Sequence, residues 1–137
     1  MIFSLADLII ATQTVWAEGR GESQQGREWI AHVLINRLQS KTGQWAKDDT
    51  LATVCLRHLQ FSAWTAGDAN FISMQKGPDL TVPAWRQCMQ AVLTAMDRTS
   101  DPTGGARHYA THAADPVWGR GRPYETVGGH RFYRGVS

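Results

Sequence analysis

Two glycines, Gly19 and Gly21, separate two apolar helical segments near the N-terminus and favour a turn or a close backbone approach between them. The first segment runs from Leu5 to Trp16. The second begins near Gln24, and its apolar side chains recur at three- and four-residue steps, as in a core-facing stripe. The pattern predicts two helices, with Glu18 at the end of the first, beside a large aromatic residue and flexible backbone.

The rest of the chain predicts further helices and then a small β region. The clearest helix begins at Pro83, a residue suited to the first helical position. Its expected core side chains are Trp85, Cys88, Met89, Val92, Leu93 and Met96. We also expect a short helix over residues 51–59, an irregular segment over residues 65–82 and a hairpin over residues 124–133 that turns at Gly128-Gly129. The expected fold class is mainly α, an α+β helical domain with a small C-terminal hairpin.

Length, charge and hydropathy narrow the class of protein. At 137 residues the chain can build one core, so we expect residues 1–137 to form a single domain, and a monomer. The formal net charge of +2 is too small for a protein that binds nucleic acid through its charge. No apolar run reaches the length of a membrane span, so no membrane insertion is expected. The first apolar segment has no basic residue before it, so we assign it to the core rather than to a signal peptide.

Glu18 is the candidate catalytic acid. Its carboxyl group is expected to be poorly solvated on the apolar side and open to a ligand on the glycine side. Desolvation disfavours the charged form, so such a group can hold its proton near neutral pH. A Glu at a helix end is more often a solvated surface residue, but the flanking glycines argue against that here. Glu22 is the rival candidate. Because it falls just before the next helix, where a carboxylate complements the helix dipole, we expect a structural role for it.

Six short motifs follow one another along most of the chain. They are Ala17-Glu18-Gly19-Arg20-Gly21-Glu22 with Gly26 and residues 31–37, then Thr53-Val54-Cys55, Gln60-Phe61-Ser62, residues 101–106, His108-Tyr109 and residues 128–133. Their order resembles that of the SleB/CwlJ-type cell-wall hydrolases, whose first motif reads Gly-Glu-Ala-Arg-Gly-Glu. Ala17 and Gly19 stand where that family usually has Gly and Ala, so both positions stay small. The resemblance implies a lysozyme-like fold, peptidoglycan cleavage and a catalytic role for the first glutamate, which corresponds to Glu18.

Glycosidases normally use two carboxyl groups, and the sequence offers no clear partner for Glu18. The remaining candidates are Glu22, Glu28, Asp68, Asp79, Asp115 and Glu125. One carboxyl group suffices when the nucleophile belongs to the substrate. In a lytic transglycosylase the acid protonates the glycosidic oxygen between MurNAc and GlcNAc, then accepts the proton of the MurNAc C6 hydroxyl as a 1,6-anhydro ring closes. We prefer this reaction, which needs no cofactor, to a muramidase that uses water.

Several polar and aromatic side chains in the later motifs are candidates for binding the glycan strand. They are Gln60, Ser62, Trp64, Tyr109 and Tyr133, with His130 as a secondary candidate beside Glu22. An amide and a hydroxyl suit sugar hydroxyls and N-acetyl groups, and a tryptophan can stack on a sugar ring. A tyrosine could reach the substrate or orient Glu18. The alternative for each residue is local hydrogen bonding or core packing, and for His130 a structural hydrogen bond is the expected role.

Two other function classes fit the sequence less well. A zinc amidase would need metal ligands, and His108 and His112 have a spacing that binds metal on a helix. However, Gly104-Gly105 and Pro116 flank them, no HExxH motif exists and His32 is distant, so no metal is expected. A non-catalytic wall-binding or virion protein usually contains repeats, and we find none. The cysteines, Cys55 and Cys88, lie in predicted helices, where free cysteine packs as a small hydrophobe, and spacing alone does not predict a disulfide.

The expected site of action raises the question of delivery. Without a signal peptide the protein would be made in the cytoplasm and reach the wall after release by a holin or inside a virion, as a phage-type endolysin does. Basic residues outnumber acidic ones near the C-terminus; they are Arg107, Arg120, Arg122, Arg131 and Arg134, against Asp115 and Glu125. This excess is consistent either with a surface that faces an anionic polymer or with an ordinary solvated surface.

Overall fold

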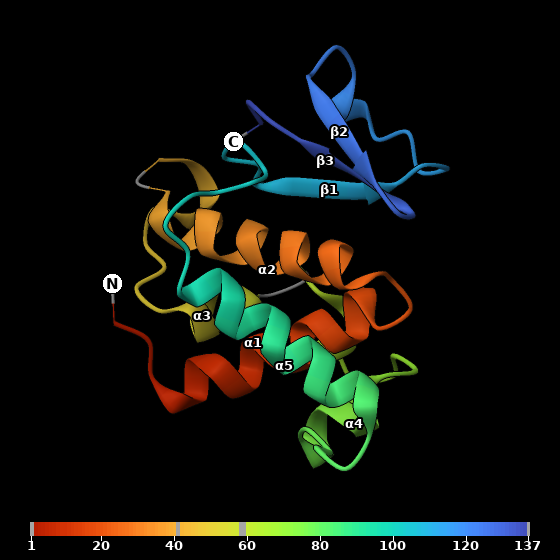
Figure 1. Cartoon of the computed structure of the whole chain (residues 1–137). Coiled ribbons are helices and arrows are strands. Elements are labelled where there is room, and N and C mark those ends of the chain that lie inside the picture. Colours follow the sequence, from red (N-terminus) through yellow and green to blue (C-terminus); the bar gives the residue numbers. More distant parts are fainter. Residues whose placement is uncertain (1, 41, 58–59, 137) are drawn as a thin grey trace.

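A computed structural model describes residues 2–40, 42–57 and 60–136 and shows a group of helices beneath a small sheet (Figure 1). The helices are α1 (Leu5–Gly19), α2 (Gln24–Gln39), α3 (Leu51–Leu56), α4 (Phe71–Lys76) and α5 (Pro83–Met96). The strands are β1 (His108–Thr111), β2 (Tyr124–Val127) and β3 (His130–Tyr133). Three short 3-10 turns are η1 (Gly43–Trp45), η2 (Ser62–Trp64) and η3 (Val117–Gly119). Helix α2 lies between the sheet and the pair α1 and α5, so the expected mainly helical α+β fold class is confirmed.

Local hydrogen bonds set where the first two helices begin. A capping box is present at the start of α1, because Asp7 N donates to Ser4 Oγ (3.1 Å) and Ser4 N donates to Asp7 Oδ2 (2.9 Å). Asp7 Oδ1 also accepts a hydrogen bond from Ala52 N (2.9 Å), which ties the start of α3 to α1. At the start of α2, Ser23 Oγ accepts from Gly26 N (3.2 Å), as expected for an N-cap residue.

Helix α1 continues through Gly19 instead of ending near Trp16, and Gly19 serves a close approach between helices. A Cβ atom at position 19 would lie 2.6 Å from Ile30 Cδ1 of α2, whereas a Cβ at Gly21 would meet nothing within 4 Å. The end of α1 therefore crosses α2 at a distance that only glycine allows. Glu18 lies in the last turn of α1, directly before this crossing.

The core lies around α2, and most predicted core positions are buried. The α2 stripe of Ile30, Val33, Leu34 and Leu38 is buried, as are Trp85, Cys88 and Val92 of α5. The prediction that Leu93 belongs to the core is wrong, because this side chain is 41% exposed. Ala91 and Ala95 of α5 are buried in the core instead. The predicted helix over residues 51–59 ends at Leu56, and residues 58 and 59 lie outside the described residues. None of the described helices is both long and apolar enough to cross a membrane.

The three strands form an antiparallel sheet in the order β1-β3-β2. The predicted hairpin is confirmed as β2 and β3, joined through Gly128-Gly129, with Val127 opposite His130. Strand β1, which lies outside the predicted hairpin, pairs with β3 so that Tyr109 lies opposite Phe132. Since side chains alternate along a strand, Tyr109 and Phe132 share the face that turns to α2, where Phe132 meets Trp29 edge-on at 5.3 Å between ring centroids.

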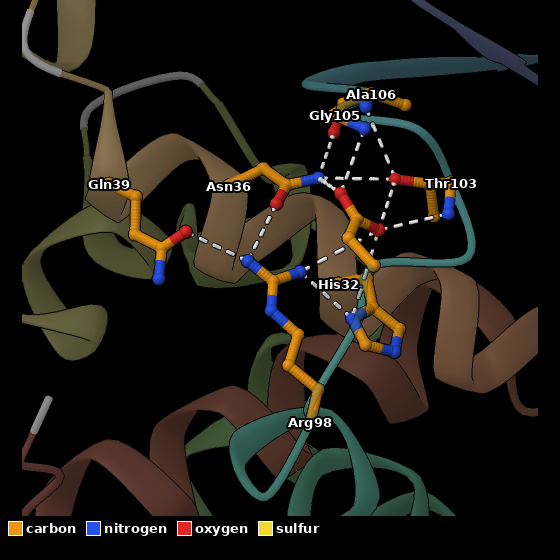
Figure 2. A network of polar contacts seen from close by, with 8 residues as sticks. His32, Asn36, Gln39, Arg98, Thr103, Gly105 and Ala106 are labelled. Carbon is orange, nitrogen blue, oxygen red and sulfur yellow. Dashed lines mark hydrogen bonds and ion pairs between the residues drawn. The ribbon is translucent and has the colours of Figure 1, made fainter.

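A polar network fastens the loop between α5 and β1 to α2 (Figure 2). Asn36 Nδ2 donates to Asp101 Oδ2 (2.9 Å), Thr103 Oγ1 (3.1 Å) and the carbonyl of Ala106 (2.8 Å). Asn36 Oδ1 accepts from Arg98 Nη2 (2.9 Å). Together these interactions hold the loop from the end of α5 to the start of β1, so they help to determine where this strand lies on α2.

His32 and Asp101 complete this network, and their pKa values are both lowered, which favours a neutral ring and an ionised carboxyl group. Arg98 Nη1 lies 2.9 Å from His32 Nδ1, which is a hydrogen bond only if the ring is neutral. Burial, and then the charge of Arg98, lower the pKa of His32 to about 4. Burial acts to raise the pKa of Asp101, but hydrogen bonds from Thr103, Asn36 and Gly105 outweigh it and lower that pKa. The network is therefore built for a neutral histidine and an ionised aspartate.

We predict that Asn36→Ala destabilises the protein by about 3 kcal/mol, because it leaves several buried polar groups without partners. The free energy of unfolding can be measured by urea denaturation. Gln39→Ala is the matched control, since exposed Gln39 makes only the Oε1 contact to Arg98 (2.8 Å) within this network, and it should cost less than about 0.5 kcal/mol. Equal unfolding midpoints for the two variants would contradict this role of Asn36.

Candidate active site

Glu18 meets Tyr109 where the end of α1 faces the inner side of the sheet. The Tyr109 hydroxyl donates a hydrogen bond to Glu18 Oε1, between residues 91 positions apart in the sequence. The Tyr109 ring is held edge-on to His130 (5.3 Å between centroids, interplanar angle 88°) and tilted against Phe132 (5.7 Å). Glu18 itself is partly buried. The structure therefore brings together two of the residues that the sequence singled out, Glu18 and Tyr109.

Opposing influences act on the Glu18 carboxyl group. Burial is the largest and raises its pKa, and the negative charge of Asp68 acts in the same direction. The Tyr109 hydrogen bond and the electrostatic influence of nearby His130 and Arg37 lower it. The net result is a pKa above the ordinary value for glutamate. The carboxyl group can thus hold a proton at a higher pH than a solvated glutamate, while groups that stabilise its ionised form lie beside it.

Arg37 of α2 places a positive charge beneath this site. Its side chain is only 6% exposed, and its Nε donates to the carbonyl of Arg107 (2.8 Å). The guanidinium carbon lies 4.7 Å from the ring centre of Trp45 and 5.3 Å from that of Phe61. Burial lowers the pKa of Arg37, which the nearby Glu18 and Tyr109 partly counter. Arg37 was included from the sequence only as part of a motif. The pattern of residues around it did not predict that it would be buried near Glu18.

Glu22 holds the β2–β3 hairpin. Both of its carboxylate oxygens accept from Gly129 N at 3.2 Å, and Oε1 lies 2.8 Å from His130 Nδ1. A Cβ atom at Gly129 would lie 2.8 Å from Oε1, so the turn closes around this carboxylate. The Glu22 carboxylate therefore contacts the hairpin, while the N-cap of α2 is Ser23. Through His130, which touches Tyr109, Glu22 also supports the ring that reaches Glu18.

The other candidate residues differ in their contacts and exposure, and none of them has a described hydrogen bond to Glu18. Trp64 Nε1 donates to Thr14 Oγ1 (3.0 Å), one helical turn before Glu18 on the same side of α1. Ser62 is exposed, and Gln60 is partly exposed, with Nε2 3.4 Å from Gln44 Oε1. Tyr133 is not brought to Glu18. It is 3% exposed and, next to Phe132 in β3, lies on the opposite face of the sheet from Tyr109.

The histidines and cysteines have surroundings of their own. His108 lies between the rings of Trp45 (5.2 Å) and Trp118 (4.8 Å), and burial is the main cause that lowers its pKa to about 4. His112 is exposed. Among residues 2–40, 42–57 and 60–136, no three His, Cys, Asp or Glu side chains gather as a group that could hold a metal ion. Cys55 and Cys88 are free and buried, which confirms that they pack as small hydrophobic residues.

Comparison with known proteins gives consistent similarities. The sequence model of the family described as Cell Wall Hydrolase matches residues 21–133, a range that includes Glu22 and begins just after Glu18. The spore cortex-lytic enzyme of Halalkalibacterium halodurans is 31% identical over 133 residues, and the match covers 95% of this chain and 35% of that protein. The spore cortex-lytic enzyme of Bacillus subtilis is 33% identical over 132 residues, covering 95% and 38% respectively. The chain thus spans little more than a third of the length of these curated relatives.

Two solved structures share the fold. The catalytic domain of the Bacillus cereus SleB protein superposes with a TM-score of 0.77 at 26% identity, covering 97% of this chain and 93% of that one. The catalytic domain of the germination-specific lytic transglycosylase SleB from Bacillus anthracis gives a TM-score of 0.75 at 26% identity, covering 96% and 97%. The arrangement of helices and sheet is therefore one that these catalytic domains also have.

We predict that Tyr109→Phe raises the pKa of Glu18 further. The substitution removes a hydrogen bond that favours the carboxylate and leaves the burial that disfavours it. The Glu18 carboxyl carbon can be followed by NMR as the pH is changed, and its midpoint should move to higher pH. Tyr124→Phe removes a hydroxyl from a tyrosine that is 45% exposed, and should leave the midpoint in place. An unchanged midpoint in Tyr109→Phe would mean that the hydrogen bond does not govern this proton.

Proposed function

The chain belongs to the SleB/CwlJ-type family of cell wall hydrolases, and we propose that it is a peptidoglycan-cleaving glycosidase with Glu18 as its general acid. The observation that carries this proposal is the partly buried Glu18 carboxyl group, whose pKa is raised and which accepts a hydrogen bond from Tyr109. Glycosidic bonds break when an acid of this kind protonates the leaving oxygen. The names of the two relatives, both spore cortex-lytic enzymes, support the same class of substrate.

In the first step, protonated Glu18 donates its proton to the oxygen that links MurNAc to GlcNAc. The bond between that oxygen and C1 of MurNAc breaks, and positive charge develops on the sugar ring. The new Glu18 carboxylate keeps the Tyr109 hydroxyl as its hydrogen-bond donor and has Arg37 nearby. Because these groups are held in place before the reaction, they stabilise the carboxylate as it forms.

In the second step, the same carboxylate acts as a base. The C6 hydroxyl oxygen of MurNAc attacks C1, its proton passes to Glu18, and a 1,6-anhydro ring closes. Glu18 ends protonated, so one carboxyl group serves both steps. Asp68, whose negative charge acts to raise the pKa of Glu18, takes no part in this reaction. Its Oδ1 accepts a hydrogen bond from Asn70 N (2.8 Å) within its own loop. The structural neighbour from Bacillus anthracis is itself named a lytic transglycosylase, which supports this reaction.

Hydrolysis by water is the alternative reaction. The observation that favours it is a second carboxyl group, that of Asp68, close enough for its charge to act on Glu18. If Asp68 oriented a water molecule toward C1, the site would have the two carboxyl groups of a muramidase. The glycan strand would lie along the side of α1 that Trp64 of η2 contacts, with Gln60 and Ser62 as further contacts. The expected role of a phage-type endolysin stays a prediction, because the relatives and structures named above are spore cortex-lytic enzymes and SleB domains.

We predict that Glu18→Gln lowers the rate of peptidoglycan cleavage by about 10²–10⁴-fold, since the amide cannot supply the proton. Clearing of a suspension of purified peptidoglycan measures the rate. Glu125→Gln makes the same chemical change at an exposed position of β2 and should keep the wild-type rate. Thermal unfolding of both variants shows whether the fold is intact. Normal clearing by a folded Glu18→Gln variant would refute the catalytic assignment.

The products distinguish the two reactions. We predict muropeptides whose MurNAc ends are lighter by one water than the products of hydrolysis, as detected by mass spectrometry. Asp68→Asn should change the rate by less than about tenfold, because no water has to be activated. Products with ordinary reducing ends, together with a large loss of rate in Asp68→Asn, would instead establish the muramidase reaction.

A further inference from the structure

The sheet has a second face that the proposed reaction does not use. Along β3, Arg131 and Tyr133 alternate with His130 and Phe132, so they point away from α2 and from Glu18. Tyr124 of β2 pairs with Tyr133 in register and lies on the same side. In Figure 1 the helices lie on one side of the sheet. We call the surface made by Trp118, Tyr124, Arg131 and the buried Tyr133 between them the outer aromatic face.

Two rings of this face are exposed to solvent, and both pack on the third. Trp118 is 40% exposed and Tyr124 is 45% exposed, whereas Tyr133 is buried. Tyr133 contacts both, with centroid distances of 5.1 Å to Trp118 and 5.5 Å to Tyr124. A Cβ atom at Gly119 would lie 2.8 Å from the Tyr133 ring, so glycine lets η3 sit closely enough to place Trp118 there. Aromatic side chains fixed in this way lose little conformational entropy when they bind a ligand.

The charge of this face is positive. The Arg131 guanidinium carbon lies 4.8 Å from the centre of the Tyr124 ring. Arg120 and Arg122 are exposed in the loop between η3 and β2. Asp115 pairs with Arg120 at 3.6 Å, while Glu125 alternates to the other side of β2. Arginines therefore outnumber carboxylates where two aromatic rings are open to solvent.

We propose that the outer aromatic face is a second binding surface for peptidoglycan, separate from the site at Glu18. Sugar rings stack on Trp118 and Tyr124, and Arg131 pairs with a carboxylate of a stem peptide. This ligand presents what the face complements, since its glycan has flat apolar ring faces and its peptides have negative charge. The proposal rests on the proposed function for the identity of the ligand. It predicts that the face contributes to binding of the polymer and not to the bond-breaking step.

The test compares binding and catalysis in variants of the whole chain. Trp118→Ala/Tyr124→Ala should weaken co-sedimentation with insoluble peptidoglycan by about tenfold, in a Glu18→Gln background so that no cleavage occurs. With Glu18 intact, the same pair of substitutions should slow clearing of insoluble peptidoglycan and leave cleavage of a soluble tetrasaccharide unchanged. Ile72→Ala, at an apolar residue of α4 that is 66% exposed, is the matched control and should change neither.

Charge is tested in the same assay. Arg131→Gln should weaken co-sedimentation several-fold and reduce its dependence on salt, whereas Arg86→Gln, at an exposed arginine of α5, should not. Unchanged co-sedimentation of the aromatic and Arg131 variants would overturn the proposal, and so would self-association of the wild type through this face, seen as a dimer that Trp118→Ala dissociates. Because co-sedimentation needs no cleavage, its result separates failure of this proposal from failure of Glu18 as the acid.

Discussion

The hydrogen bond from Tyr109 to Glu18 joins the first helix to the C-terminal sheet, and much of the structure serves to keep its two partners in place. On one side, Gly19 lets the end of α1 come against Ile30, which sets the position of Glu18. On the other side, Asn36 fixes the residues that precede β1, and Glu22 closes the hairpin whose His130 touches the Tyr109 ring. Helix α2 lies between these regions, so errors in its packing would move both partners.

In the proposed reaction, this bond would let one carboxyl group serve as both acid and base. Burial alone would hold the proton on Glu18 and make the carboxylate costly to form. The Tyr109 hydroxyl and the buried Arg37 act in the opposite direction, because each stabilises the ionised group. A two-step reaction through a single residue requires a carboxyl group that is protonated at rest and can still lose its proton at little cost in free energy. Arg37 suits this role because an arginine keeps its charge even where burial lowers its pKa.

Features with local causes could be predicted from the sequence, and features with distant causes could not. The capping box at Ser4, the stripe of α2 and the turn at Gly128-Gly129 follow from neighbouring residues, and the structure has all of them. Arg37 was missed because its neighbours Trp45 and Phe61 come from other segments, and no pattern around it indicates burial. Tyr109 and Tyr133 were equal candidates in the sequence, yet they lie on opposite faces of the sheet. The pairing of β1 with β3 decides which tyrosine faces Glu18, and no local sequence pattern indicates this pairing.

The alternation of side chains along β3 lets one small sheet serve two surfaces. Each step along the strand moves from the face that meets α2 to the opposite face, so His130 and Phe132 lie on the side of Glu18 while Arg131 and Tyr133 belong to the outer aromatic face. A shift of one residue in the pairing would exchange these sets and leave both surfaces without their side chains. The contacts of Glu22 with Gly129 and His130 hold the hairpin at its turn, where such a shift would begin. The Glu22 carboxylate therefore has a structural role at the hairpin, on which the positions of the side chains on both faces of the sheet depend.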